Sequence, residues 1–101
     1  MTIKKLKSMP YAQAHVEIMP DGEINLFSYE TLVVSVDPNG FCQISGLYSM
    51  TTRRHVSRFA EEYLKPLNYY DLKKAYEGNY VINYMTGEII PWLDYVNDGE
   101  G

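Results

Sequence analysis

The stretch Ala14–Ile44, AHVEIMPDGEINLFSYETLVVSVDPNGFCQI, determines the fold of the first half of this chain. Within it, Met19-Pro20-Asp21-Gly22 and Asp37-Pro38-Asn39-Gly40 share one pattern, with Pro second, Asp or Asn third and Gly fourth. Pro presets φ, the Asx residue suits the bridge region and Gly accepts a left-handed backbone. Each segment therefore predicts a type I turn with a following bulge that closes a β-hairpin.

Apolar and polar residues alternate around both turns, which is typical of half-buried strands. We therefore expect four short antiparallel strands in a meander with one apolar face. The residues predicted on that face are Ala14, Val16, Ile18, Ile24, Leu26, Leu32, Val34, Val36, Cys42 and Ile44.

The segment after the meander predicts a helical cover for this apolar face. Apolar residues recur at helical spacing over residues 51–65, and Pro66 ends the helix. A shorter helix follows Asn68, which can cap it, and stops at Gly78. The predicted fold class is α+β: a four-stranded antiparallel meander followed by an amphipathic helix packed on one face, a second short helix and a short C-terminal hairpin or strand.

Composition predicts a single domain over residues 1–93, followed by an acidic, frayed tail at residues 94–101. The net charge of −4 argues against a protein that coats nucleic acid non-specifically. A lone cysteine, Cys42, excludes an internal disulfide and a cysteine-based zinc site, and we expect it to be a buried, inert thiol. We predict no cofactor, no metal site and no membrane partner. With no signal peptide or membrane span visible, the expected location is the cytoplasm of whatever cell makes the protein, which the resemblance described below would make a bacterial host.

The start of the first predicted helix carries positive charge where a helix disfavours it. Its first turn bears Arg53, Arg54 and His55, although each cation near the positive end of the helix dipole costs about 0.3–1 kcal/mol. This arrangement suggests an anionic partner held by backbone amides, hydroxyls and guanidinium groups. The predicted binding residues are Ser49, Thr51, Thr52, Arg53, Arg54, His55 and Arg58. The alternative is that the arginines pair internally with Glu17, Glu23 or Glu30.

Tyrosine is the second candidate for binding, because the chain has 10 of them in 101 residues. Tyrosine is enriched at protein interfaces and at surfaces that stack bases. Helical spacing predicts Tyr63 and Tyr76 in the core. Tyr69 and Tyr70 are adjacent and cannot both point inward, so we add both to the predicted binding residues and expect at least one to be exposed.

Catalytic groupings are weak. Ser49, His55 and an acid resemble a hydrolase triad in composition only, and Glu17 with Glu30 is a pair of carboxylates without a supporting motif. We expect His55 to be a solvated residue at the helix end, with its basicity lowered by the neighbouring arginines. The sequence therefore predicts a protein that is not an enzyme.

Two runs, KLKSMPYAQA at residues 5–14 and GLYSMTTRRH at residues 46–55, resemble a family of small uncharacterised proteins carried by phages and mobile elements of gut Firmicutes. The resemblance covers residues 3–90. It implies no activity, cofactor or catalytic residue, but it implies a context. Small acidic phage proteins without active sites often bind a host component, and some inhibit CRISPR nucleases and other defences.

Three functions remain open at this point. The leading hypothesis is a non-catalytic phage or mobile-element protein that binds and inhibits a host protein through the arginines and neighbouring tyrosines. The second is a nucleic-acid-binding protein that uses the same residues. The third is a structural homo-oligomer, for example a homodimer through the open edge of the last strand of the meander.

Overall fold

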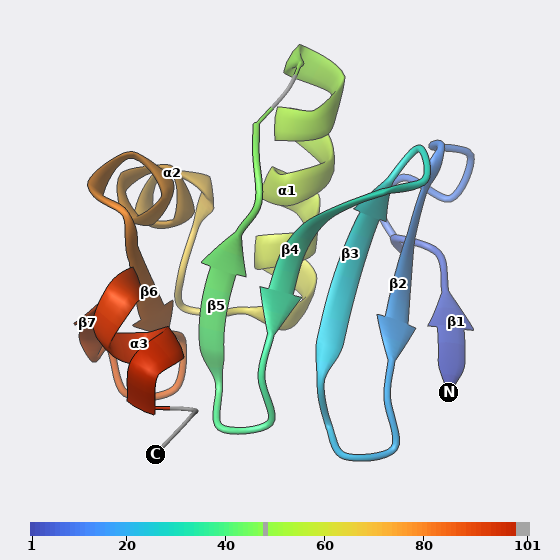
Figure 1. The fold of residues 1–101 in the computed structure, drawn as a ribbon. Helices are drawn as coiled ribbons and strands as arrows, with labels where there is room; N and C mark the ends of the chain where they lie inside the picture. The colour runs from blue at the N-terminus through green and yellow to red at the C-terminus, as the bar shows by residue number, and fades with distance from the viewer. Residues whose placement is uncertain (48, 99–101) are drawn as a thin grey trace.

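Seven strands form one antiparallel sheet in which each strand pairs with its neighbours in the chain, in the order β1 to β7 (Figure 1). The computed structural model describes residues 1–47 and 49–98. The strands are β1 (Thr2–Lys4), β2 (Ala14–Ile18), β3 (Ile24–Ser28), β4 (Thr31–Val36), β5 (Phe41–Ile44), β6 (Tyr80–Asn83) and β7 (Ile89–Pro91). The predicted α+β class is confirmed, and the four predicted strands are β2 to β5.

The two Pro-Asx-Gly turns close hairpins as predicted. Gly22 and Gly40 have φ values of +99° and +103°, and each donates its amide to the carbonyl of the residue three positions earlier, at 3.0 Å. A side chain at these positive φ values would be strained, which explains the requirement for glycine there. These two turns set the register of β2 with β3 and of β4 with β5.

The predicted meander has four strands, whereas the sheet in the structure has seven. β1 adds to one edge through β2, and β6 pairs with β5, where Phe41 lies opposite Asn83. The final strand of the predicted meander, β5, is therefore not an open edge, and the edges of the sheet are β1 and β7.

One predicted core residue of β4 was wrong because the strand contains a bulge. The register between β3 and β4 shifts between Leu26 and Phe27, so Leu32 pairs with Phe27 and is 36% exposed. Val33 is fully buried in its place. A bulge changes the face on which the following side chains lie, and strict alternation cannot reveal it.

Helices α1 (Met50–Tyr63) and α2 (Tyr69–Gly78) cover one face of the sheet, and α3 (Trp92–Asp98) lies on the other (Figure 1). The core lies between the sheet and the first two helices. It includes the fully buried residues Leu6, Val16, Leu26, Val34, Val56, Phe59, Leu64 and Leu72. Its helical members follow the predicted spacing, whereas Tyr76, predicted inward, is 44% exposed.

Helix α2 begins as predicted at a capping box. The Asn68 side chain accepts from the amide of Asp71 at 3.1 Å, and the Asp71 carboxylate accepts from the amide of Asn68 at 2.9 Å. Each satisfies a donor that the helix start leaves without an internal partner. The last helical residue is Gly78, and the left-handed residue that caps the helix is Asn79 rather than Gly78.

Helix α3 occupies most of the segment predicted as a frayed tail from residue 94; residues 99–101 lie outside the described part of the chain. Tyr95 donates a hydrogen bond to Asp37 at 2.6 Å and contacts the ring of Phe41. Burial, together with this bond to a carboxylate, raises the pKa of Tyr95 well above its usual value. The helix packs against β6, where Val81 is fully buried.

Glu62 on α1 holds the loop that leads from β1 to β2. Its carboxylate accepts from the amide of Lys7 at 2.8 Å, and from the amide and hydroxyl of Ser8 at 3.1 and 2.8 Å. Burial alone would raise the pKa of Glu62, but these hydrogen bonds outweigh it and the pKa lies below its ordinary value. The ionised form is therefore the one that the folded state stabilises.

Glu62→Ala is expected to lower the free energy of unfolding by about 1–2 kcal/mol, because it removes charge-assisted bonds to two amides. The contribution of Glu62 is present above the pKa of an unfolded glutamate and disappears as pH falls through its lowered folded pKa. Urea denaturation at neutral pH measures the loss. The matched control is Glu61→Ala, whose exposed pairing with Arg58 is worth at most about 0.5 kcal/mol. Equal losses for the two variants would contradict this role of Glu62.

Among the described residues, no helix is both long enough and apolar enough to span a membrane.

Candidate functional site

The start of α1 is capped by a serine and keeps its arginines free of internal acids. The Ser49 hydroxyl accepts from the amide of Thr52 at 3.1 Å, as expected for an N-cap. No acid lies in the first turn. Within the described part of the chain, neither Arg53 nor Arg54 forms an ion pair with a carboxylate. The internal pairing alternative is therefore wrong: Glu17 contacts His15 instead.

The structure places His55 in the core and not at a solvated helix end. Its side chain is 1% exposed, and its Nδ1 lies 2.8 Å from the Oγ of Ser28 on β3. Burial lowers the pKa of His55, so the direction predicted from the sequence holds but the cause is desolvation. His55 is therefore removed from the set of accessible binding residues.

Thr52 shares this buried position. Its Oγ1 lies 3.3 Å from the Oγ of Ser28, and the Ser49 hydroxyl donates to it at 3.2 Å. A chain of polar contacts thus runs from the exposed Ser49 through Thr52 and Ser28 to His55. Thr52 lies on the buried side of the start of α1, whereas the neighbouring Thr51 is exposed.

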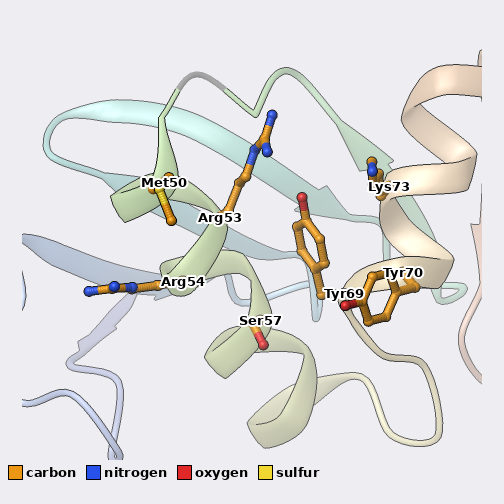
Figure 2. A pocket seen from close by; sticks show the side chains of 7 residues that line it. All are labelled: Met50, Arg53, Arg54, Ser57, Tyr69, Tyr70 and Lys73. Atoms are coloured by element: carbon orange, nitrogen blue, oxygen red, sulfur yellow. The ribbon is translucent and has the colours of Figure 1, made fainter.

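The arginines and the tyrosines that the sequence singled out separately meet in one groove. This groove, about 350 Å³ in volume, lies between α1 and α2 (Figure 2) and is called the α1–α2 groove below. Its lining residues are Met50, Arg53, Arg54, Ser57, Tyr69, Tyr70 and Lys73. Three of the seven are cations and none is an acid. The arrangement can therefore hold a negatively charged group against an aromatic wall.

The two tyrosines form that wall. Their rings meet edge to face with centroids 5.5 Å apart. Tyr69 is half-buried against the core, and Tyr70 is 68% exposed, so the prediction that at least one of them is exposed is confirmed. Figure 2 shows Tyr69 standing between the two helices, with its hydroxyl toward the end of the groove where Arg53 and Lys73 lie.

Arg53 and Arg54 leave α1 in different directions. In Figure 2, Arg53 lies on the side of Tyr69, whereas Arg54 points away from the tyrosines. Arg54 also lines a second hollow of about 410 Å³ with Met9, Ser57, Arg58 and Glu61. Arg58 is partly neutralised there, because its Nη1 lies 3.3 Å from the carboxylate of Glu61. A single anion clasped by both Arg53 and Arg54 is thus not the geometry that the structure presents.

Three groove residues, Met50, Ser57 and Lys73, were missed from the sequence. Met50 and Ser57 lie one helical turn from Arg53 or Arg54, and Lys73 lies one turn after Tyr69, so i,i+4 spacing around the predicted residues was the available signal. That α1 and α2 present these turns to each other could not be read from spacing.

The described residues give the catalytic groupings no common site. Ser49 contacts Thr52 and not His55, and no group of three or more His, Cys, Asp or Glu side chains is placed there to hold a metal ion. Burial raises the pKa of the Cys42 thiol to about 12, as expected for an inert cysteine.

Comparison with known proteins yields one family. A family model described as "Family of unknown function (DUF8033)" matches residues 1–82. The match is consistent with the prediction that the chain belongs to an uncharacterised family. No curated protein and no solved structure matches this chain at a significant level.

Proposed function

The chain belongs to the family of unknown function DUF8033, and we propose that it is a non-catalytic binding protein whose α1–α2 groove takes an acidic segment of a host protein. The observation that carries the proposal is that neither Arg53 nor Arg54, the fourth and fifth residues of α1, has a carboxylate partner among the described residues. Helix α1 begins at Met50, so Arg53 closes the first turn and Arg54 lies just beyond it. A cation near the positive end of a helix is disfavoured, and a partner that supplies negative charge offsets this cost.

The composition of the groove supports a protein as the partner. Arginine, tyrosine and methionine are the residues enriched at the centres of protein interfaces, and they make up five of the seven lining residues. Exposed Met50 and Tyr70 offer apolar surface beside the charges. A partner segment that combines carboxylates with an apolar side chain would match both properties.

The proposed setting is a phage or mobile element, with inhibition of a host macromolecule such as a defence nuclease as the effect. This part of the proposal rests on the resemblance of residues 5–14 and 46–55 to phage-borne proteins.

Nucleic-acid binding is the second candidate, and one observation favours it. Tyr70 presents an exposed ring in the groove that Arg53 and Lys73 also line, and aromatic rings combined with cations are how single strands are held without sequence preference.

An NMR titration of the ¹⁵N-labelled protein distinguishes the two. The probes are a twelve-residue peptide of three Glu-Leu-Glu-Glu repeats and a twelve-nucleotide oligothymidylate. We expect the peptide to shift amide signals of residues 50–57 and 69–73 and to saturate at the lower concentration. Tighter binding of the oligothymidylate would replace the first candidate with the second, provided that log affinity falls with log salt by about 0.7 per phosphate contacted. If neither probe shifts these signals, both candidates are wrong.

A further inference from the structure

The α1–α2 groove is the first of three hollows that follow α1. The second contains Met9, Arg54, Ser57, Arg58 and Glu61. The third, about 360 Å³ in volume, is lined by Lys4, Lys7, Glu61, Glu62, Tyr63 and Lys65. Neighbouring hollows share residues: Arg54 and Ser57 belong to the first two, and Glu61 to the last two. Together they form one surface, called the α1 track below, from the start of α2 to β1.

Positive charge in this molecule is concentrated on the α1 track. Seven of the nine Lys and Arg residues of the chain line it, whereas of the eleven acidic residues whose side chains the structure describes only two do. The basic members are Lys4, Lys7, Arg53, Arg54, Arg58, Lys65 and Lys73. A chain with a net charge of −4 thus presents one strongly basic surface, which selects the approach of an anionic partner from that side.

The two acids of the track are already engaged. Glu61 contacts Arg58, and Glu62 accepts hydrogen bonds from the loop at Lys7 and Ser8. They divide the basic residues into a near group at the α1–α2 groove and a far group around Lys4, Lys7 and Lys65.

We propose that the partner segment is an extended acidic stretch of polypeptide that crosses the whole α1 track. This inference rests on the proposed function and extends it from one groove to a path. α1 has 14 residues and is therefore about 21 Å long at 1.5 Å per residue. An extended chain rises about 3.3 Å per residue, so the segment along α1 alone spans roughly six residues.

A polypeptide fits the track better than a nucleic acid does, for an electrostatic reason. A nucleic-acid strand carries a negative charge at every nucleotide, and such a strand would bring phosphates past Glu61 in the middle of the track. A polypeptide can place a neutral or basic residue opposite Glu61 and carboxylates on either side. Met9 and Met50 also offer apolar contacts that phosphates do not use.

Three double variants, each with the same change in net charge, test the inference. The quantity compared is their affinity for the twelve-residue peptide of Glu-Leu-Glu-Glu repeats. The near variant is Arg53→Glu/Lys73→Glu, the far variant is Lys4→Glu/Lys65→Glu, and the control is Lys5→Glu/Lys74→Glu, whose residues line none of the three hollows. Relative to the control, we expect the far variant to weaken binding about tenfold, since two exposed ion pairs become two repulsions. Affinities come from the NMR titration described above.

The outcomes separate the inference from the proposed function. If only the near variant binds more weakly than the control, the α1 track is wrong and the α1–α2 groove stands. If neither the near nor the far variant differs from the control, the proposed function fails as well. If a twelve-nucleotide oligothymidylate binds more tightly than the peptide and loses affinity in both the near and the far variants, the partner is a nucleic acid and the polypeptide inference is overturned.

Discussion

The variant Arg53→Glu/Lys73→Glu is expected to weaken binding of the acidic peptide by about 100-fold, because each reversal replaces an attraction with a repulsion inside a confined groove. Both side chains line the α1–α2 groove, and no acid lies among its seven residues to screen the change. The NMR titration with the twelve-residue peptide measures the loss.

The same change is expected to act on stability in the opposite direction. Glutamate in the first turn of a helix interacts favourably with its positive end, by about 0.3–1 kcal/mol, where arginine interacts unfavourably. Arg53 has no carboxylate partner among the described residues, so Arg53→Glu alone breaks no internal ion pair. Urea denaturation of the single variant should therefore show an equal or higher free energy of unfolding while binding falls.

A gain in stability with a loss of binding is the signature of a residue kept for a partner. For binding, the control is Lys5→Glu/Lys74→Glu, which carries the same change in net charge as Arg53→Glu/Lys73→Glu. For the stability of the single variant, the control is Lys5→Glu alone. If Arg53→Glu instead destabilises the fold by more than about 1 kcal/mol, an internal partner for Arg53 exists and the central argument for an external anion fails.

Local backbone chemistry was the part of the fold that the sequence predicted well. Gly22 and Gly40 adopt the positive φ that their turns require, and Asn68 and Asp71 form a complete capping box. These features depend on residues within four positions of each other, so their identities are enough to specify them.

Pairing between distant segments was not predictable in the same way. β6 begins 36 residues after β5 ends, and its register is held by contacts at the Asn39-Gly40 turn. The Asn83 side chain donates to the carbonyl of Asn39 at 3.0 Å, and the amide of Tyr84 donates to the carbonyl of Gly40 at 3.1 Å. Such contacts leave no periodicity in the sequence, and strands of three or four residues are too short to show alternation.

The sequence predicted several residues of the candidate site but not the groove in which they meet. The misplaced charge at Arg53 and Arg54 and the adjacent tyrosines were visible as separate anomalies, but their common groove depends on how α1 packs beside α2. His55 was misassigned although a signal was present. It lies three positions after Thr52 and four before Phe59, which places it on the buried face of α1. Its polar character suggested solvent, whereas Ser28 on the sheet supplies the polar contact inside the core.

His55→Ala is expected to lower the free energy of unfolding by about 3 kcal/mol, because it leaves a cavity and deprives the buried Ser28 hydroxyl of a partner. His55 is 1% exposed and Ser28 is 2% exposed, so water cannot readily replace the imidazole. The loss is large against a total stability of about 5–15 kcal/mol for a domain. Urea denaturation at pH 8 measures it, and Ser57→Ala on the outward face of α1 is the control for a change on the same helix.

The pH dependence tests the same contact without relying on the size of the cavity. Burial holds the pKa of folded His55 below its ordinary value of 6.5. At a pH between the folded pKa of His55 and the unfolded pKa, the imidazole binds a proton in the unfolded chain but not in the folded one. The free energy of unfolding therefore falls as pH decreases through this range, and it is fully retained above pH 6.5. His55→Asn keeps an acceptor near Nδ1 but cannot titrate, so it should remove this part of the slope and recover part of the stability lost in His55→Ala. If His55→Asn retains the full slope of the wild-type protein from pH 7 to pH 5, His55 is not the group that titrates. Burial of His55 against Ser28 would then make no contribution to the pH dependence of the free energy of unfolding.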